Sequence, residues 1–183
     1  APQVQLERYD LTFAQDGSLQ LAVWNGDAPT GNVGDGIRWS DPNNWTTGDT
    51  VDELPTATAP GGNVVFQKAP TVGTVLLGAD RVVNSLTFQD DYHLTGHALT
   101  ITSGIINVQE DTTAAITAML ASNSGLTKSG TGTLIVTTTS SELVVDQGIL
   151  VLPKSGSIEN LKIDSGATGV GFSIFLNLHR SMY

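Results

Sequence analysis

Short apolar runs separated by turn residues recur along the chain from residue 64 onward. The first three begin at Val64, Val75 and Leu86, so successive starts lie 11 residues apart. Further apolar runs follow at less regular intervals and begin at Leu99, Ile105, Leu134, Leu143, Ile149 and Leu161. Such short strands, with turns so close together, do not suit a conventional sandwich. They suit a coil in which each turn buries a few apolar side chains against the next, so the pattern predicts an all-β solenoid over residues 63–170.

The remaining segments differ from this rhythm. Residues 1–24 hold two alternating runs around the Ala14–Gly17 turn, which predicts an N-terminal β segment. Residues 25–62 are rich in Gly, Asp, Asn, Pro and Thr, which predicts an irregular loop that caps the solenoid. Residues 171–183 predict an apolar C-terminal strand or tail. Residues 112–121 fit a helix by their alanines and a strand by their alternation, and the strand is the favoured interpretation.

Several phrases of the sequence match a known pattern. Residues 125–136 read GLTKSGTGTLIV and residues 144–151 read VVDQGILV. Upstream stand Trp24-Asn25-Gly26, WSDPNNW at 39–45 and VVNSLTF at 82–88. On these residues, the chain resembles the autotransporter-associated β-strand repeat proteins, which occur in bacterial autotransporter passengers and other large surface proteins. One full copy of the repeat phrase is present, and the resemblance covers roughly residues 24–170.

The resemblance implies a fold and a location. It implies a short right-handed parallel β-solenoid, or β-helix, displayed outside the cell. Together with the segments above, the expected fold is all-β, with an N-terminal β segment and a Trp/Gly/Asp-rich capping loop before the solenoid. Members of the family act as stalks, adhesins or exported passengers, and the repeat itself carries no catalytic residues.

The amino-acid composition excludes several classes of binding partner and of site. The net charge is −10 with only 8 Lys plus Arg, which argues against nucleic acid and anionic membrane surfaces as partners, because both need clustered cations. The chain has no cysteine, which excludes disulfides, thiolate metal sites and cysteine nucleophiles. No apolar run approaches the roughly 20 residues of a membrane helix, so direct membrane insertion is not expected. The start at Ala1 predicts a mature N-terminus after signal-peptide cleavage, and hence an extracellular or bacterial cell-surface location.

Catalytic patterns are sparse. His93 and His97 have helical metal-ligand spacing, but they flank a turn between expected strands, so surface turn positions are expected. The pairs Asp90-Asp91 and Glu110-Asp111 lie at the ends of apolar runs. Two such acids on a solenoid face could act as general acid and base on a glycan, whereas adjacent acids at strand ends are usually solvated turn residues. The expected protein is not an enzyme.

The loop over residues 25–62 offers two candidate ligand chemistries. Asp27, Asp35, Asp41 and Asp49 are candidate Ca²⁺ ligands among glycines and asparagines, although the spacing matches no EF-hand; no other cofactor is expected.

The tryptophans of this loop allow two interpretations. If exposed, Trp39 and Trp45 could stack on sugar rings. If turned inward, they would form a miniature core for the loop, which is the commoner arrangement.

Both ends of the chain carry candidate interaction strands, because a solenoid leaves unpaired edges at its first and last turns. The apolar positions are Val4, Leu6, Leu11 and Phe13 at one end, and Phe172, Ile174, Leu176 and Leu178 at the other. Strand addition between copies would give head-to-tail assembly, with the N-terminal segment as the preferred donor.

Three functions follow from these observations. The first is a non-enzymatic exported structural protein that self-associates into an extracellular filament or surface layer. The second is a cell-surface adhesin or glycan-binding module that uses the tryptophan loop. The third is a carbohydrate-active β-helix enzyme that uses the acid pairs.

Overall fold

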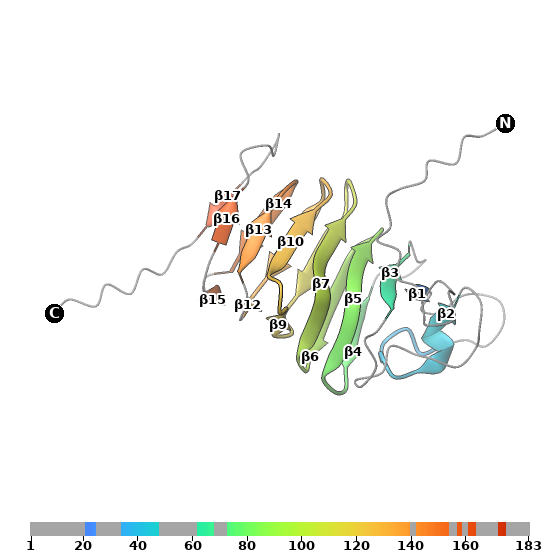
Figure 1. Cartoon of the computed structure of the whole chain (residues 1–183). Coiled ribbons are helices and arrows are strands. Elements are labelled where there is room, and N and C mark those ends of the chain that lie inside the picture. Colours follow the sequence, from blue (N-terminus) through green and yellow to red (C-terminus); the bar gives the residue numbers. More distant parts are fainter. Residues whose placement is uncertain are drawn as a thin grey trace.

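The computed structural model describes residues 21–24, 34–47, 62–67, 73–139, 142–153, 157–158, 161–163 and 172–174. Within these ranges, every strand pairing is parallel except the one between β1 (Leu21–Trp24) and β2 (Trp45–Thr47). The strands lie side by side along one axis, as Figure 1 shows. The predicted all-β parallel solenoid is therefore confirmed. Within the described residues, no helix is long and apolar enough to cross a membrane, and the one helical element is the 3-10 turn η1 (Pro42–Asn44).

The ladder contains three stacks of strands. The first stack runs from β1 through β3 (Asn63–Phe66), the second halves of β5 (Arg81–Phe88) and β7 (Leu99–Val108), β10 (Leu126–Ser129), β13 (Leu143–Val145) and β16 (Leu161–Ile163). The second stack contains β4 (Thr74–Leu77), β6 (Tyr92–Gly96), β8 (Thr113–Ile116), β11 (Thr133–Val136), β14 (Ile149–Leu152) and β17 (Phe172–Ile174). The third stack contains the first halves of β5 and β7, β9 (Leu120–Ala121), β12 (Thr138–Thr139) and β15 (Ser157–Ile158).

The core is built from columns of side chains in register. Alternate residues of a strand point to opposite faces, so each short strand sends one or two side chains inward. In the second stack, one column contains Val75, Leu94, Ile116 and Val136, all fully buried. Burying a side chain of this size stabilises the fold by roughly 1.5–3 kcal/mol. The strand interpretation of residues 112–121 is confirmed, because β8 and β9 occupy that stretch.

The turn inside the 125–136 phrase is a corner of the solenoid. β10 and β11 do not pair with each other, because β10 belongs to the first stack and β11 to the second. Gly130 bends the chain there with a φ of 73°. Gly132 packs so closely that a Cβ on it would lie 2.0 Å from the Gln109 carbonyl oxygen. Residues 125–136 therefore form a strand of the first stack, the corner that follows it and a strand of the second stack.

Both ends of the described chain join the same body. Leu21–Trp24 pairs in parallel with Asn63–Phe66, so the end of the N-terminal segment forms the first strand of the first stack. Phe172–Ile174 pairs in parallel with Leu150–Leu152 of the same chain. The other predicted interaction positions, Val4, Leu6, Leu11, Phe13, Leu176 and Leu178, lie outside the described residues.

Candidate functional site: the capped end of the solenoid

Two segments of the chain cover the first edges of the solenoid. β1 lies along β3 and covers its outer edge. Residues 37–39 lie along β4, where the Leu76 N–H donates to the Ile37 carbonyl at 2.8 Å and the Trp39 N–H donates to the Leu76 carbonyl at 3.1 Å. These contacts satisfy backbone groups that an open sheet edge would expose. The covering segments 21–24 and 34–47 are named the N-terminal cap (blue at one end of Figure 1).

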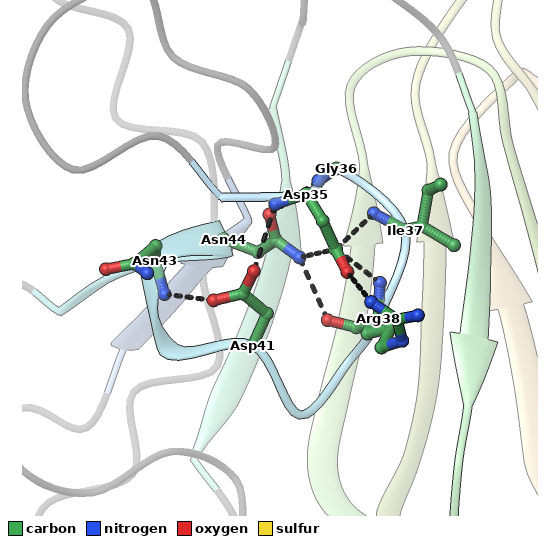
Figure 2. A network of polar contacts seen from close by, with 7 residues as sticks. All are labelled: Asp35, Gly36, Ile37, Arg38, Asp41, Asn43 and Asn44. Carbon is green, nitrogen blue, oxygen red and sulfur yellow. Dashed lines mark hydrogen bonds and ion pairs between the residues drawn. The ribbon is translucent and has the colours of Figure 1, made fainter.

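Asp35 anchors the cap loop. Its Oδ1 accepts the backbone N–H groups of Ile37 and Arg38, both at 2.8 Å, and the Asn44 amide at 2.9 Å. Its Oδ2 accepts Arg38 Nη1 at 2.7 Å, as Figure 2 shows. Desolvation alone would raise the pKa of Asp35, but the hydrogen bonds from Arg38, Asn44 and Ile37 outweigh it and hold the pKa far below its usual range. The carboxylate therefore stays charged and fixes the turn.

Asn44 ties the rest of the loop to this anchor. Its side chain is fully buried, accepts the Gly36 N–H through Oδ1 at 2.8 Å, and donates to the Arg38 carbonyl at 2.9 Å. Gly34 packs against it so closely that a Cβ there would lie 1.9 Å from Asn44 Oδ1. Asp41 completes the network, because its two oxygens accept the N–H groups of Asp35 and Asn43 at 3.0 Å.

This network engages the carboxylate oxygens of two of the candidate Ca²⁺ ligands, Asp35 and Asp41. The oxygens of Asp35 and Asp41 face hydrogen-bond donors, and an N–H cannot coordinate a cation. The part of the chain that the structure describes holds no group of three His, Asp or Glu side chains placed to bind a metal. Asp27 and Asp49 lie outside the described residues. Asp35 and Asp41 thus act in the described loop as structural acceptors.

The tryptophans turn inward, which is the favoured of the two interpretations of this loop, so Trp39 and Trp45 do not present the exposed rings that glycan stacking would need. Their exposed fractions are 1% and 8%, which leaves no ring face for a sugar. The Trp45 ring lies 4.9 Å from Trp24 and 4.7 Å from Trp39 in edge-to-face arrangements, and its Nε1–H donates to the Trp39 carbonyl at 2.7 Å. Phe66 continues this cluster toward the solenoid core. The arrangement in the structure is the miniature core that was the favoured interpretation.

Lys128 is a buried residue that the sequence analysis did not single out. It stands in the inward-facing column of the first stack and is fully buried. Its ammonium donates to the carbonyls of Ser129 at 3.0 Å and Gly130 at 2.6 Å. Burial lowers the pKa of Lys128 to about 8, and the charge of Asp146 opposes part of that shift. The alternation around Leu126 was the signal, since it places residue 128 on the inner face.

The acid pairs lie on one corner, between the first and second stacks. Asp91 Oδ1 accepts the Thr113 N–H at 2.6 Å, and Asp90 Oδ1 accepts the Asp91 N–H at 2.9 Å. Glu110 and Asp111 occupy the same corner one turn later and are exposed. The acids therefore serve or flank turns, as their position at strand ends indicated.

The two histidines have separate partners. His93 Nε2 lies 2.8 Å from Thr117 Oγ1, whereas His97 Nδ1 lies 3.5 Å from Asp80 Oδ1. His93 lies within β6 and His97 directly follows its end. Four residues along an extended strand separate the two side chains, so the i, i+4 spacing does not bring them to one metal.

Comparison with known proteins gives one informative similarity. The chain is 29% identical over 165 residues to an adhesin, the BmaC autotransporter of Brucella suis biovar 1 (strain 1330). The match covers 85% of this chain and 5% of that protein, so the chain spans a small part of its relative. No protein-family model matches the chain, and no solved structure matches it.

Proposed function

We propose that this chain is a non-catalytic, surface-displayed β-solenoid segment with an adhesive role, of the kind that autotransporter passengers carry. The similarity to the BmaC autotransporter adhesin supports export and adhesion. The observation that carries the proposal is the capped parallel ladder: the N-terminal cap covers β3 and β4, and the columns then continue through every later turn. A ladder of this kind is an extended scaffold whose outer faces are available for recognition.

The test displays the chain on a non-adherent laboratory bacterium through a heterologous translocator. We expect attachment to mammalian epithelial monolayers several-fold above that of cells that carry the empty translocator. The matched control is the Asn44→Asp variant, whose cap is weakened, displayed at the same antibody-measured surface density. Because the density is equal, a difference in attachment between the two reports on the folded cap and not on the amount of protein displayed. Attachment equal to the empty translocator, at confirmed surface density of the folded chain, would contradict the adhesive role.

Head-to-tail self-association is a second proposal. One observation supports it, namely that the C-terminal end of the ladder has strand edges that could accept a strand from another copy. Among the described residues, β16 and β17 each pair with a strand on one side only. The opposite end is covered by the chain's own cap, so a donor from another copy would have to displace β1 or residues 37–39. Negative-stain electron microscopy of the purified chain at neutral pH, with and without calcium, tests this directly. Regular filaments support it, and monomers at all concentrations contradict it.

A further inference from the structure

An open hollow lies on the outer face of the second stack, over the strands of its first three turns. It has a volume of about 340 Å³ and is lined by Gly73, Thr74, Asp91, His93, Thr113 and Ala115. This set is named the outer hollow. Its volume is at the lower end of the range for small-ligand sites.

Two rows of outward side chains border the outer hollow. In one row, Thr74 pairs in register with His93 and His93 with Ala115. In the other row, Asp91 Oδ1 accepts a hydrogen bond from the Thr113 N–H. Successive turns of a β ladder lie about 4.8 Å apart, so these groups surround a space a few ångströms across. The small side chain of Ala115, beside the larger His93, leaves room for a ligand at this point.

The row of outward side chains that contains Ala115 becomes aliphatic beyond the outer hollow. One turn later, the row of Ala115 continues with Ile135 and Val151, and the row of Thr113 reaches Ile149 after Thr133. These outward aliphatic positions are half-buried. Carboxylate and imidazole groups therefore lie beside the outer hollow, whereas the next turns carry mainly aliphatic side chains in the same rows.

Several polar atoms of the outer hollow are left for a ligand. Asp91 uses Oδ1 on the Thr113 backbone, and its Oδ2 has no protein partner among the described residues. The hydroxyls of Thr74 and Thr113 likewise have none there. His93 engages Thr117 through Nε2, which leaves Nδ1. The site thus offers hydroxyls that both donate and accept, together with one carboxylate acceptor.

This chemistry selects a class of ligand. Among the described residues that line it there is no Lys or Arg, and Asp91 repels anions, so phosphate, sulfate and acidic sugars are disfavoured. Tyr92 also borders the space, but its ring is buried and its hydroxyl donates to the Gln67 carbonyl. The described lining residues therefore offer no exposed aromatic face on which a nucleobase could stack. Hydroxyl-rich neutral ligands satisfy both the carboxylate and the threonine hydroxyls.

We infer that the outer hollow binds a neutral saccharide unit of a surface glycan. This inference rests on the proposed adhesive function and names its ligand class. It moves glycan recognition from the buried tryptophans of the cap to the side of the solenoid. The openness of the site suits one or two units of a longer chain, and hence weak binding strengthened by multivalent display.

The experiment measures binding of the purified full chain to an array of neutral and acidic glycans, with immobilised polylysine as a cationic arm. Hits are titrated by saturation-transfer NMR. Two variants remove the site: Ala115→Phe fills the outer hollow, and Thr74→Val removes a hydroxyl without a change of shape. Ile135→Thr, one turn away on the same row, is the matched control. Thermal unfolding confirms that each variant folds.

We expect Ala115→Phe to weaken binding of neutral glycans at least about tenfold and Thr74→Val about three- to tenfold, whereas Ile135→Thr stays within twofold. Asp91→Asn separates the two arms, since an amide still bonds to sugar hydroxyls but loses attraction for a cation. Binding to polylysine alone, abolished by Asp91→Asn, would overturn the inference in favour of a basic peptide. Neutral-glycan binding that survives Ala115→Phe, or no glycan binding while the displayed chain still attaches to cells, would overturn the inference and leave the adhesive function standing.

Discussion

Lys128 stands in register between Ile106 on one turn and Val145 on the next, in a column of buried aliphatic side chains. The methylene stem fills the space that a leucine would fill, while the ammonium reaches the corner of its own turn. There it donates to the carbonyls of Ser129 and Gly130, which face inward where the chain bends. The lysine in the GLTKSGTG phrase is therefore a core residue that also closes a corner.

Substitutions at Lys128 separate these two roles. We expect Lys128→Met to lower the free energy of unfolding by about 1–2 kcal/mol, because the two carbonyls lose their charged donor. The loss is no larger because the variant also avoids the cost of burying a charge. Lys128→Ala should lower it by about 3 kcal/mol, because a cavity is added. Urea unfolding measures both, with the exposed Lys162→Met as a control within about 0.5 kcal/mol. A Lys128→Met variant more stable than the parent would show that the corner bonds contribute less than the buried charge costs.

The same lysine predicts a pH dependence. Burial lowers the pKa of Lys128 to about 8, whereas the unfolded chain keeps a value near 10.5. Between these values the unfolded state holds the proton that the folded state has released, so stability rises with pH. Below pH 8 both states are protonated and this contribution is flat. Urea titrations from pH 7 to 10 should show the rise in the parent chain and its absence in Lys128→Met; equal profiles would contradict the assignment.

The short apolar runs and their turns were enough to predict the solenoid, because each run places one or two side chains inward and no more. The assignment of Leu126, Leu134 and Val145 to the core follows from alternation alone. The same alternation places Lys128 on the inner face, although a lysine is ordinarily found at the surface. The three-stack geometry depends on corners such as the register shift between Val83 and Ser85, which sequence spacing does not reveal.

The cap was predicted as a loop, but its contacts were not. Asp35 and Asp41 match a cation site by composition, and only the structure shows that backbone N–H groups of the same loop occupy their oxygens. Trp39 and Trp45 could point either way from sequence, because burial depends on what the loop folds against. Here that surface is Phe66 at the first turn, 42 residues after Trp24 and paired with it in the ladder.

Asn44 tests the cap network with little change of shape. In Asn44→Asp, the two amide donor bonds to Asp35 and Arg38 disappear, and a carboxylate faces the Asp35 carboxylate. We expect a loss of about 3 kcal/mol in the free energy of unfolding of the cap. Hydrogen exchange of β1 and β2 amides measures it locally. Asn43→Asp is the control, because Asn43 donates to Asp41 through its backbone N–H, which the substitution keeps. Equal losses in both variants would mean that the Asn44 side chain is not the anchor.

Gly148 tests the corner next to Lys128. It has a φ of 75°, and a Cβ there would lie 2.5 Å from the carbonyl oxygens of Gly130 and Gly132 and 2.8 Å from Lys128 Nζ. We expect Gly148→Ala to lower the free energy of unfolding by about 2–4 kcal/mol. Gly78→Ala is the control, since nothing lies within 4 Å of its Cβ position, and it should stay within about 0.5 kcal/mol. An unchanged free energy of unfolding in Gly148→Ala would mean that the strands at this corner can move apart to make room for the Cβ.

Trp39 tests whether the cap protects the edges of the solenoid. In Trp39→Ala, the loss of a buried indole should destabilise the cap by about 3–5 kcal/mol and uncover the backbone edges of β3 and β4. Such edges pair with strands of other copies, so we expect concentration-dependent oligomers by size-exclusion chromatography with light scattering. Trp39→Phe keeps an aromatic ring in the cluster and should remain like the parent chain. A monomeric Trp39→Ala at the highest soluble concentration would show that edge coverage by the cap does not limit association. Oligomers that also lose circular dichroism would indicate unfolding, whereas oligomers with an intact β spectrum would indicate pairing of solenoid ends.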